Sequence, residues 1–236
     1  YNKKTDSEHL LAVRGDYMRD GWLSLPGTLK EAETISSLLE DKGINVCLLK
    51  NNIANEESFK NLSGNSPDIL HIATHGFYIE DIDESKNEYI KSAVGNTLKD
   101  VIMQRSGLLF SGANNSWKGN YPPDAEDGIL TSEELARLDL SNTKLAILSA
   151  CKTGLGETGY VDGVFGLQRA LKKAGVETIV MSLWSVNDEV TAELMQHFYN
   201  FLLCGESKHK AFKHATKLLQ EEYPEARYWA AFVMLD

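Results

Sequence analysis

The sequence predicts an α/β fold with an open, mostly parallel six-stranded sheet and helices on both faces. Short apolar runs alternate along the chain with segments of helical periodicity. This alternation indicates parallel strands joined by crossover helices. Of 236 residues, 42% are hydrophobic and 25% are charged, which is typical of a globular protein with a sizeable core.

Six apolar runs are the candidate strands. Each is short and bounded by polar or turn-forming residues, as expected for strands buried in a parallel sheet. In chain order the runs are His9–Val13, Ile44–Leu49, Ile69–Ala73, Leu145–Ser149, Val176–Met181 and Trp229–Leu235.

Helical periodicity fills the intervals between these runs. Thr28 is a candidate N-cap of a first helix, which Gly43 ends. Thr131 and Glu134 have the spacing of a capping box. Later helices are expected at Val164–Leu171, ended by Gly175, at Val190–Leu203 and at Lys208–Glu222.

One stretch, from about Tyr78 to Gly128, interrupts the alternation. It is rich in Asn, Asp, Ser, Gly and Lys, and it separates two strands that would otherwise be neighbours. Ordered loops of this length are uncommon and tend to be functional or mobile. We expect a single domain over residues 1–236 with this long insertion. Because the sequence begins at Tyr1 rather than Met, we also expect a fragment of a longer protein.

Charge and composition exclude several classes of function. The chain has 24 Lys and Arg against 34 Asp and Glu, a formal net charge of −10, which argues against a nucleic-acid partner. It has no secretory signal and no apolar run long enough to span a bilayer, so we expect no membrane partner and a cytoplasmic location. Cys47, Cys151 and Cys204 lack the close pairs of a zinc site, and we expect neither metal nor cofactor.

Two residues with nucleophile and base chemistry follow two of the predicted strands. His75-Gly76 comes after the third apolar run, and Cys151 comes after the fourth. The carboxyl ends of parallel strands meet at one edge, so adjacent strands would bring an imidazole and a thiol together. An imidazole raises the thiolate fraction of a neighbouring cysteine. The N–H groups of Gly76 and Cys151 could then hold the oxyanion of a tetrahedral intermediate.

Structural explanations compete with this interpretation. A cysteine or a histidine alone at a strand end is more often a buried residue with no chemical role. His71 is a second imidazole inside the apolar run, and a core role suits it better. A zinc site formed by His71 and His75 is weaker still, since the segment is a predicted strand without an intervening acid.

A glycine pattern offers a further alternative. Gly154, Gly156 and Gly159 match a dinucleotide-binding fingerprint that follows a strand. The third glycine should open the next helix directly, but Tyr160–Gly163 intervene, and the pattern stands in the fourth unit rather than the first. Nucleotide binding is therefore disfavoured.

The chain resembles the CHAT domain family, caspase-like peptidase domains often found with tetratricopeptide repeats and related to separase. The resemblance covers nearly the whole chain. The segments that carry it are Leu25-Pro26-Gly27 with Glu31 and Glu33, Asp68–Gly76, Leu148–Gly154, Ser182–Asp188 and Tyr228–Val233.

The resemblance implies a caspase-type sheet in which His75 and Cys151 form the catalytic dyad and Gly76 and Cys151 form the oxyanion hole. His71 would be structural. By similarity to separase, Asp188 would bind a basic P1 side chain, although an N-cap for the next helix is an equally good role for it. Trp184 would be a wall of the P1 pocket or a core residue.

The sequence thus predicts a cysteine endopeptidase that cleaves protein substrates after a basic residue. Expected partners are the protein substrate and a regulatory repeat region or activator protein, and the long insertion would cover the cleft or act as an activation segment. The alternative is a catalytically silent CHAT-type interaction or scaffold module.

Overall fold

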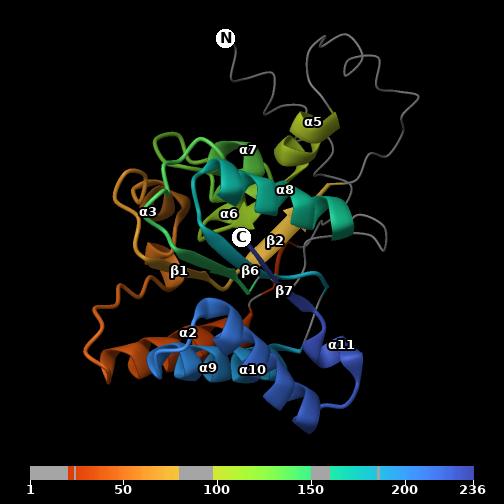
Figure 1. Ribbon diagram of the computed structural model, residues 1–236. Coiled ribbons are helices and arrows are strands. Elements are labelled where there is room, and N and C mark those ends of the chain that lie inside the picture. Colours follow the sequence, from red (N-terminus) through yellow and green to blue (C-terminus); the bar gives the residue numbers. More distant parts are fainter. Residues whose placement is uncertain (1–20, 24, 80–97, 150–159, 185–186) are drawn as a thin grey trace.

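The computed structural model describes residues 21–23, 25–79, 98–149, 160–184 and 187–236. Helices lie above and below a central sheet in this part of the chain (Figure 1). The expected strand His9–Val13 and the glycine pattern at residues 154–159 lie outside the described residues.

The central sheet has four strands in the order β1-β5-β6-β7 among the described residues. They are β1 (Ile69–Ile72), β5 (Leu145–Leu148), β6 (Thr178–Ser182) and β7 (Phe232–Leu235). Strands β1, β5 and β6 are parallel, and β7 is antiparallel to β6. The α/β class is confirmed, but the sheet is mixed, with two parallel pairs and one antiparallel pair, and it has four described strands where the sequence predicted six.

The predicted strand Ile44–Leu49 is wrong for the described structure, in which these residues form no strand. Ile44 is 43% exposed and Leu49 is 39% exposed. Val46 alone in this run packs, partly buried, against a core cluster. Because a short apolar run becomes a strand only when a neighbouring strand takes up its hydrogen bonds, its composition was insufficient evidence.

Two helical layers cover the sheet, which confirms helices on both faces (Figure 1). One layer consists of α2 (Pro26–Glu40), α9 (Asp188–Leu203) and α10 (Lys208–Glu222), with α11 (Ala226–Trp229) at its end. The other contains α7 (Ser132–Leu135) and α8 (Tyr160–Lys173).

The alternating side chains of β5 explain why both faces are covered. Leu145 and Ile147 belong to the core beneath α2 and α9, whereas Ala146 and Leu148 belong to the core beneath α8. All four are almost completely buried. A strand with apolar residues on both sides requires a helical layer on each face.

The predicted helix signals were correct in part. The capping box is present, since the Thr131 side chain accepts from the Glu134 N–H and the Glu134 carboxylate accepts from the Thr131 N–H. Thr28 is not an N-cap, because α2 begins at Pro26 and the Thr28 hydroxyl donates to the Leu25 carbonyl. Proline has the backbone angle of a first helical residue and needs no N–H there, so the helix starts earlier.

The long insertion contains regular structure and a second, three-stranded sheet in the order β2-β3-β4. The adjacent pairing of β1 with β5 confirms that it separates neighbouring strands. Its described elements, from the strand that leads into it to the strand that follows, are β2 (His75–Tyr78), α5 (Leu98–Arg105), β3 (Ser106–Leu109), α6 (Ala113–Trp117) and β4 (Ile129–Thr131). All strand pairs of this sheet are antiparallel.

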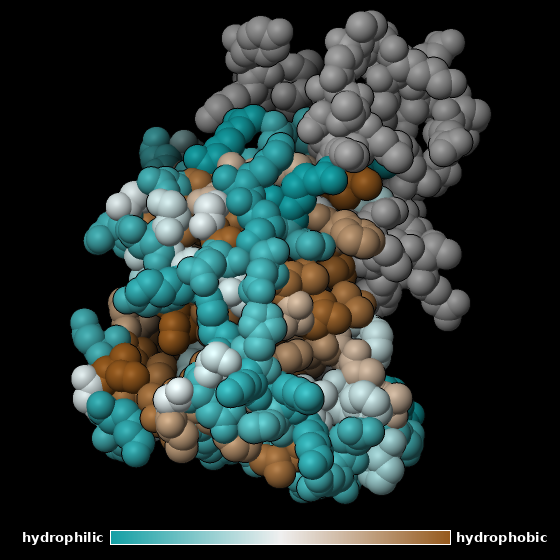
Figure 2. All heavy atoms as spheres, viewed as in Figure 1, coloured by the Kyte–Doolittle hydropathy of each residue, from teal (hydrophilic) through white to brown (hydrophobic). Residues whose placement is uncertain are grey.

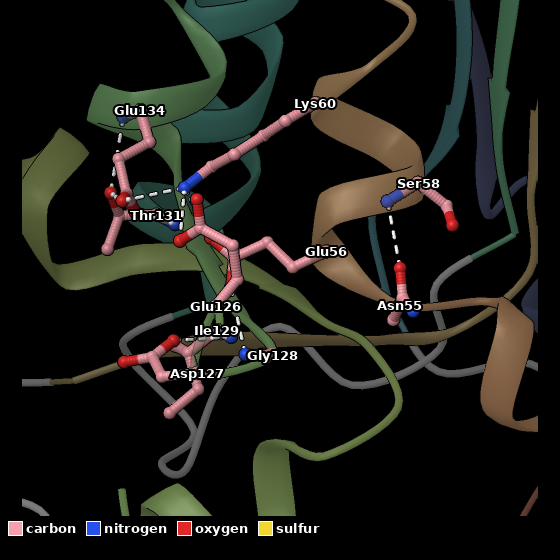
Figure 3. A network of polar contacts seen from close by, with 10 residues as sticks. All are labelled: Asn55, Glu56, Ser58, Lys60, Glu126, Asp127, Gly128, Ile129, Thr131 and Glu134. Carbon is pink, nitrogen blue, oxygen red and sulfur yellow. Dashed lines mark hydrogen bonds and ion pairs between the residues drawn. The ribbon is translucent and has the colours of Figure 1, made fainter. Parts of the chain in front are cut away.

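An ion-pair network joins the second sheet to α3 (Glu56–Lys60), which follows the short 3-10 helix η1 (Asn51–Ile53). Glu56 is 1% exposed; its Oε1 pairs with Lys60 Nζ at 2.7 Å, and its Oε2 accepts from the Gly128 N–H at 2.8 Å. Lys60 also reaches Glu126 at 3.0 Å and Glu134 at 3.3 Å (Figure 3). The network anchors α3 to both ends of β4.

The buried Glu56 predicts a component of stability that depends on pH. Burial raises the pKa of Glu56 from 4.5 to about 7, so the folded protein retains a proton that the unfolded chain releases between these values. Stability from this group is therefore lost as the pH rises from about 4.5 to about 7. Urea midpoints across this window should fall less steeply in Glu56→Gln than in wild type. Glu57→Gln, the exposed neighbour, is the control, and an unchanged slope in Glu56→Gln would contradict the assignment.

Candidate active site at the carboxyl edge of the sheet

The parallel strands bring their carboxyl ends to one edge. Strands β1, β5 and β6 end at Ile72, Leu148 and Ser182, and the Ser149 N–H donates to the Ile72 carbonyl at 2.9 Å. His75 and Trp184 follow the first and third of these strands, as predicted. Cys151 follows the middle one in the sequence and lies outside the described residues.

His75 is the first residue of β2 and pairs with Leu109 of β3. Its Nε2 lies 2.6 Å from the carbonyl oxygen of Leu23, and its ring lies 5.2 Å from the ring of Trp22. A carbonyl oxygen can only accept, so Nε2 carries the hydrogen. In the neutral ring, Nδ1 is then the basic nitrogen.

Gly76 is buried in the same strand. Hydrogen-bonded and non-hydrogen-bonded pairs alternate along an antiparallel ladder. The Ile79 N–H donates to the Arg105 carbonyl of the facing chain at 2.9 Å. Every second residue before it in β2 has the same orientation, so the N–H groups of Phe77 and His75 also point toward β3. The N–H of Gly76 therefore points to the side of β2 away from β3.

Asp188 is the first residue of α9 and is partly buried. The alternative that it caps this helix is wrong, because Asn187 is the N-cap and accepts from the N–H groups of Glu189 and Val190. The Asp188 side chain packs directly on Gly27, where an added Cβ would overlap it. Among the described residues, no hydrogen bond or ion pair reaches its carboxylate.

Trp184 lies at the surface and not in the core. It is 37% exposed, and its indole N–H donates to the Arg227 carbonyl at 3.1 Å. This contact joins the end of β6 to α11. The core alternative for Trp184 is wrong because the chain leaves the sheet before this residue.

One short segment contacts both His75 and Asp188. Leu23 holds the imidazole through its carbonyl, and Gly27 lies against the carboxylate. Four residues of chain span at most about 14 Å, so these contacts place both side chains along one rim. The role of Leu23 was not predicted from the sequence, because every residue has a backbone carbonyl and the sequence does not show which one will contact the imidazole. The Leu-Pro-Gly motif was the available signal.

His71 belongs to a buried network and not to a metal site. Its Nε2 lies 2.9 Å from the carboxylate of Glu31, whose other oxygen accepts from the Ser149 hydroxyl at 2.9 Å. Its Nδ1 lies 3.2 Å from the hydroxyl of Tyr199, whose pKa is raised by burial and by the nearby Glu31. Both ring nitrogens of His71 thus have a partner, as expected for a core histidine.

Among the described residues, no group of three or more His, Cys, Asp or Glu side chains could hold a metal ion. None of the helices in this part of the chain has the length and apolar content needed to cross a membrane.

The close contact between Gly27 and Asp188 predicts that a methyl group at position 27 lowers the stability of the protein. Alanine is the better helix former, so Gly27→Ala would stabilise α2 in the absence of this contact. We expect it to destabilise the protein by about 1–3 kcal/mol because the contact is overpacked. Urea denaturation measures the change. Lys30→Ala, on the exposed face of the same helix, should stay within about 0.5 kcal/mol, and a stabilised Gly27→Ala would show that the contact is absent.

The buried carboxylate of Glu31 predicts a second effect. Glu31→Gln keeps the shape but removes the negative charge and turns one acceptor oxygen into a donor, so both hydrogen bonds lose their charge assistance and the one to Ser149 must reverse its direction. We expect a loss of about 1–3 kcal/mol in the free energy of unfolding. Glu33→Gln, which breaks an exposed ion pair with Lys50, should cost less than about 1 kcal/mol. Equal effects of the two changes would rule out the network as an anchor.

Comparison with known proteins identifies the family of this chain. A sequence model described as CHAT domain matches residues 3–236. Tetratricopeptide repeat protein 28 of Mus musculus is 29% identical over 115 residues, which are 48% of this chain and 5% of that protein. The Homo sapiens protein of the same name is 28% identical over the same length and the same shares. The chain thus matches a small part of these relatives. With a matching family model over nearly its whole length and with the expected sheet edge, the chain belongs to the CHAT domain family.

Proposed function

We propose that this domain is a cysteine endopeptidase in which Cys151 is the nucleophile and His75 is the general base and acid. Membership of a caspase-like peptidase family supports the proposal. So does the position of His75 beside the end of β1, the strand adjacent to the one that leads to Cys151. The whole chain, residues 1–236, would act as one domain.

The observation that carries the proposal is the hydrogen bond between His75 Nε2 and the Leu23 carbonyl, 2.6 Å long. It leaves Nδ1 as the basic nitrogen. In the proposed mechanism Nδ1 takes the proton of the Cys151 thiol, because the thiolate is the attacking species. The carbonyl also stabilises the imidazolium that results. His75 then gives the proton to the leaving amine.

The oxyanion of the tetrahedral intermediate would lie between the N–H groups of Gly76 and Cys151. The Gly76 N–H supports this role because it points away from the β2–β3 ladder. Its position beside His75 also suits the role, since one substrate carbonyl must reach the thiol and this donor together. Loss of one such donor typically costs about 3–4 kcal/mol of transition-state stabilisation.

Asp188 would select a basic P1 side chain. Its partly buried carboxylate has no ion-pair partner among the described residues and lies on the same rim as His75. A guanidinium can bind such a carboxylate through two parallel hydrogen bonds. Trp184 would form a wall of this pocket, since it is exposed between the end of β6 and α9.

Regulation by another part of the protein or by an activator is a further element of the proposal. The relatives that match are named for tetratricopeptide repeats. A repeat region or an activator protein would control access of a protein substrate to the rim. The formal charge of −10 suits an enzyme that attracts basic substrates rather than nucleic acid. We propose the cytoplasm as its location.

Covalent labelling tests the mechanism. A peptidyl-Arg acyloxymethyl ketone should add one mass increment to the full-length wild-type protein with its activator present, and none to Cys151→Ala or His75→Ala. Asp188→Asn should slow labelling by about 10- to 100-fold through loss of charge-assisted hydrogen bonds. Glu189→Gln, the exposed neighbour on the same helical turn, is the matched control. Equal labelling rates in Asp188→Asn and Glu189→Gln would contradict the role of Asp188 in P1 selection.

An interaction or scaffold module is the second candidate function. The names of the matching relatives favour it, since they refer to repeats and to no catalytic activity. The same experiment separates the two. Wild-type protein that stays unlabelled at Cys151, while retaining the fold and its bound partner, would support the scaffold.

A further inference from the structure

Strand β1 has one open edge. In the described structure it pairs with β5 alone. The Ser149 N–H donates to the Ile72 carbonyl, so the backbone groups of Ile72 and of every second residue before it face β5. The residues between them direct their backbone groups to the opposite side. The N–H and C=O groups of Ile69 and His71 therefore face the open edge, and no described residue bonds to them.

This edge lacks the features that protect an exposed strand. Proteins cover open strand edges or block them with charges or proline, because an unpaired edge binds other strands. The sequence of β1, Ile-Leu-His-Ile, contains neither lysine nor proline. Leu70 and Ile72 are buried on one face of β1, and the His71 side chain is only 12% exposed on the other. We therefore expect another strand to pair with this edge.

An apolar cavity of about 260 Å³ lies at the amino end of the edge. Both Ile69 of β1 and Ile44, in the coil after α2, line it. Their side chains are 37% and 43% exposed. Figure 2 shows hydrophobic side chains (brown) on the left of the molecule, near the coil that joins α2 to α3 in Figure 1. An apolar space thus lies between β1 and this coil.

One segment of the chain has the composition to fill this space. The apolar run His9–Val13 is a predicted strand that lies outside the described residues. Apart from His9, its residues are apolar at both sets of alternating positions. This pattern is typical of a strand inside a sheet that is covered on both faces. The sheet beside β1 has such covers, since α2 and α8 lie on opposite faces.

The path of the chain favours a parallel orientation of this run. Trp22 and Leu23 contact His75 at the carboxyl edge of the sheet, and α2 then leads to Leu39, which lines the cavity at the amino edge. Residues 14–20 span at most about 25 Å. A run that ends beside Ile72 can therefore reach Trp22 without crossing the sheet.

The hand of the connection determines which segment lies next to β1. Crossovers between parallel strands are nearly always right-handed. The crossover from β5 to β6 passes through α8 on one face, whereas α2 lies on the other. A right-handed connection through α2 therefore moves the chain away from β5. The coil that follows α2 then lies outside the run, and the run lies next to β1.

We propose that His9–Val13 pairs in parallel with the open edge of β1, inside the coil Ile44–Leu49, and that this pairing holds the Leu23 carbonyl on the imidazole of His75. The run would fix the chain before Trp22, as Glu31 fixes the helix after it. The pairing itself is independent of peptidase activity. Its meaning for catalysis rests on the proposed function.

Hydrogen exchange of backbone amides in the whole chain tests the pairing. The amides of Ile69 and His71 should be protected, and Leu11→Asp should speed their exchange about tenfold or more, because a charge in a covered strand opposes docking. Leu218→Asp makes the same change at an exposed position of α10 and is the matched control. Val180, in the centre of the sheet, should stay protected in both variants. Unprotected Ile69 and His71 amides in the wild type, with Val180 protected, would overturn the proposal.

Cross-linking tests the position of the run in folded protein, whatever the stability of Leu11→Asp. Cys151→Ala and Cys204→Ser remove two of the three natural thiols and leave Cys47 in the coil after α2. In this background Leu10→Cys or Leu11→Cys should be joined to Cys47 within one chain by a short bis-maleimide, because neighbouring strands lie about 5 Å apart. Cys47→Ser should abolish the product. Links between two chains alone would overturn the proposal in favour of a second copy at the edge, and so would the absence of any link.

Nitrogen-15 NMR of the His75 ring tests the coupling without any need for activity. In Cys151→Ala the ring should carry its hydrogen on Nε2, as the Leu23 carbonyl requires. Added Leu11→Asp should move the ring signals toward a mixture of the two tautomers, and added Leu218→Asp should leave them in place. Unchanged ring signals in a Leu11→Asp protein whose Ile69 amide has lost protection would overturn the coupling, even if Cys151 proves to be catalytic. A shift in a protein that is never labelled at Cys151 would support the coupling and contradict the proposed function alone.

Discussion

The carboxylate of Glu31 is the interaction on which the candidate site depends. It is 3% exposed and bonded to His71 of β1 on one side and to Ser149, after β5, on the other. A buried carboxylate is tolerated only when its oxygens are hydrogen-bonded, and hydrogen bonds have narrow limits of distance and angle. Glu31 therefore holds α2 in one position against the carboxyl edge of the sheet. No apolar contact between a helix and a sheet would define that position as closely.

From this anchor the start of α2 reaches both proposed functional side chains. The Leu23 carbonyl orients His75, and Gly27 sets how closely α2 approaches Asp188. Pro26 begins the helix between these two contacts. The rim is thus built by backbone and packing rather than by a cluster of ionisable groups. This explains how a histidine and a carboxylate that are far apart in the sequence come to lie along one short segment.

The second sheet extends the same rim on the side of His75. It continues the chain beyond β1 and gives His75 a partner in Leu109. Trp22 packs on His75 of β2 and on Trp117 of α6. The segment before α2 is therefore held in place by two elements of the second sheet and its insertion. One face of this sheet has a small apolar core of its own, whereas Leu108 and Leu130 on the other face belong to the core beneath α8. The insertion is therefore packed both against the central core and against the rim.

Most patterns that local chemistry determines were read correctly from the sequence, the N-cap at Thr28 being an exception. The apolar run of β5, the capping box at Thr131 and the helix ended by Gly175 depend on a few neighbouring residues. Patterns that depend on a partner far away in the sequence were read incorrectly. The run Ile44–Leu49 had strand composition without a strand neighbour among the described residues, and Trp184 had core composition at a point where the chain leaves the sheet.

The sequence by itself determined the α/β class, the positions of the central strands along the chain and the candidate pair His75 and Cys151, because apolar periodicity and strand-end position are local properties. Only the tertiary structure decided the hydrogen on His75 Nε2, the packing of Gly27 on Asp188 and the role of Glu31 as an anchor. These depend on groups from separate elements meeting at hydrogen-bond or van der Waals distance. A backbone carbonyl is the same in every residue, so its position becomes informative only once the chain has folded.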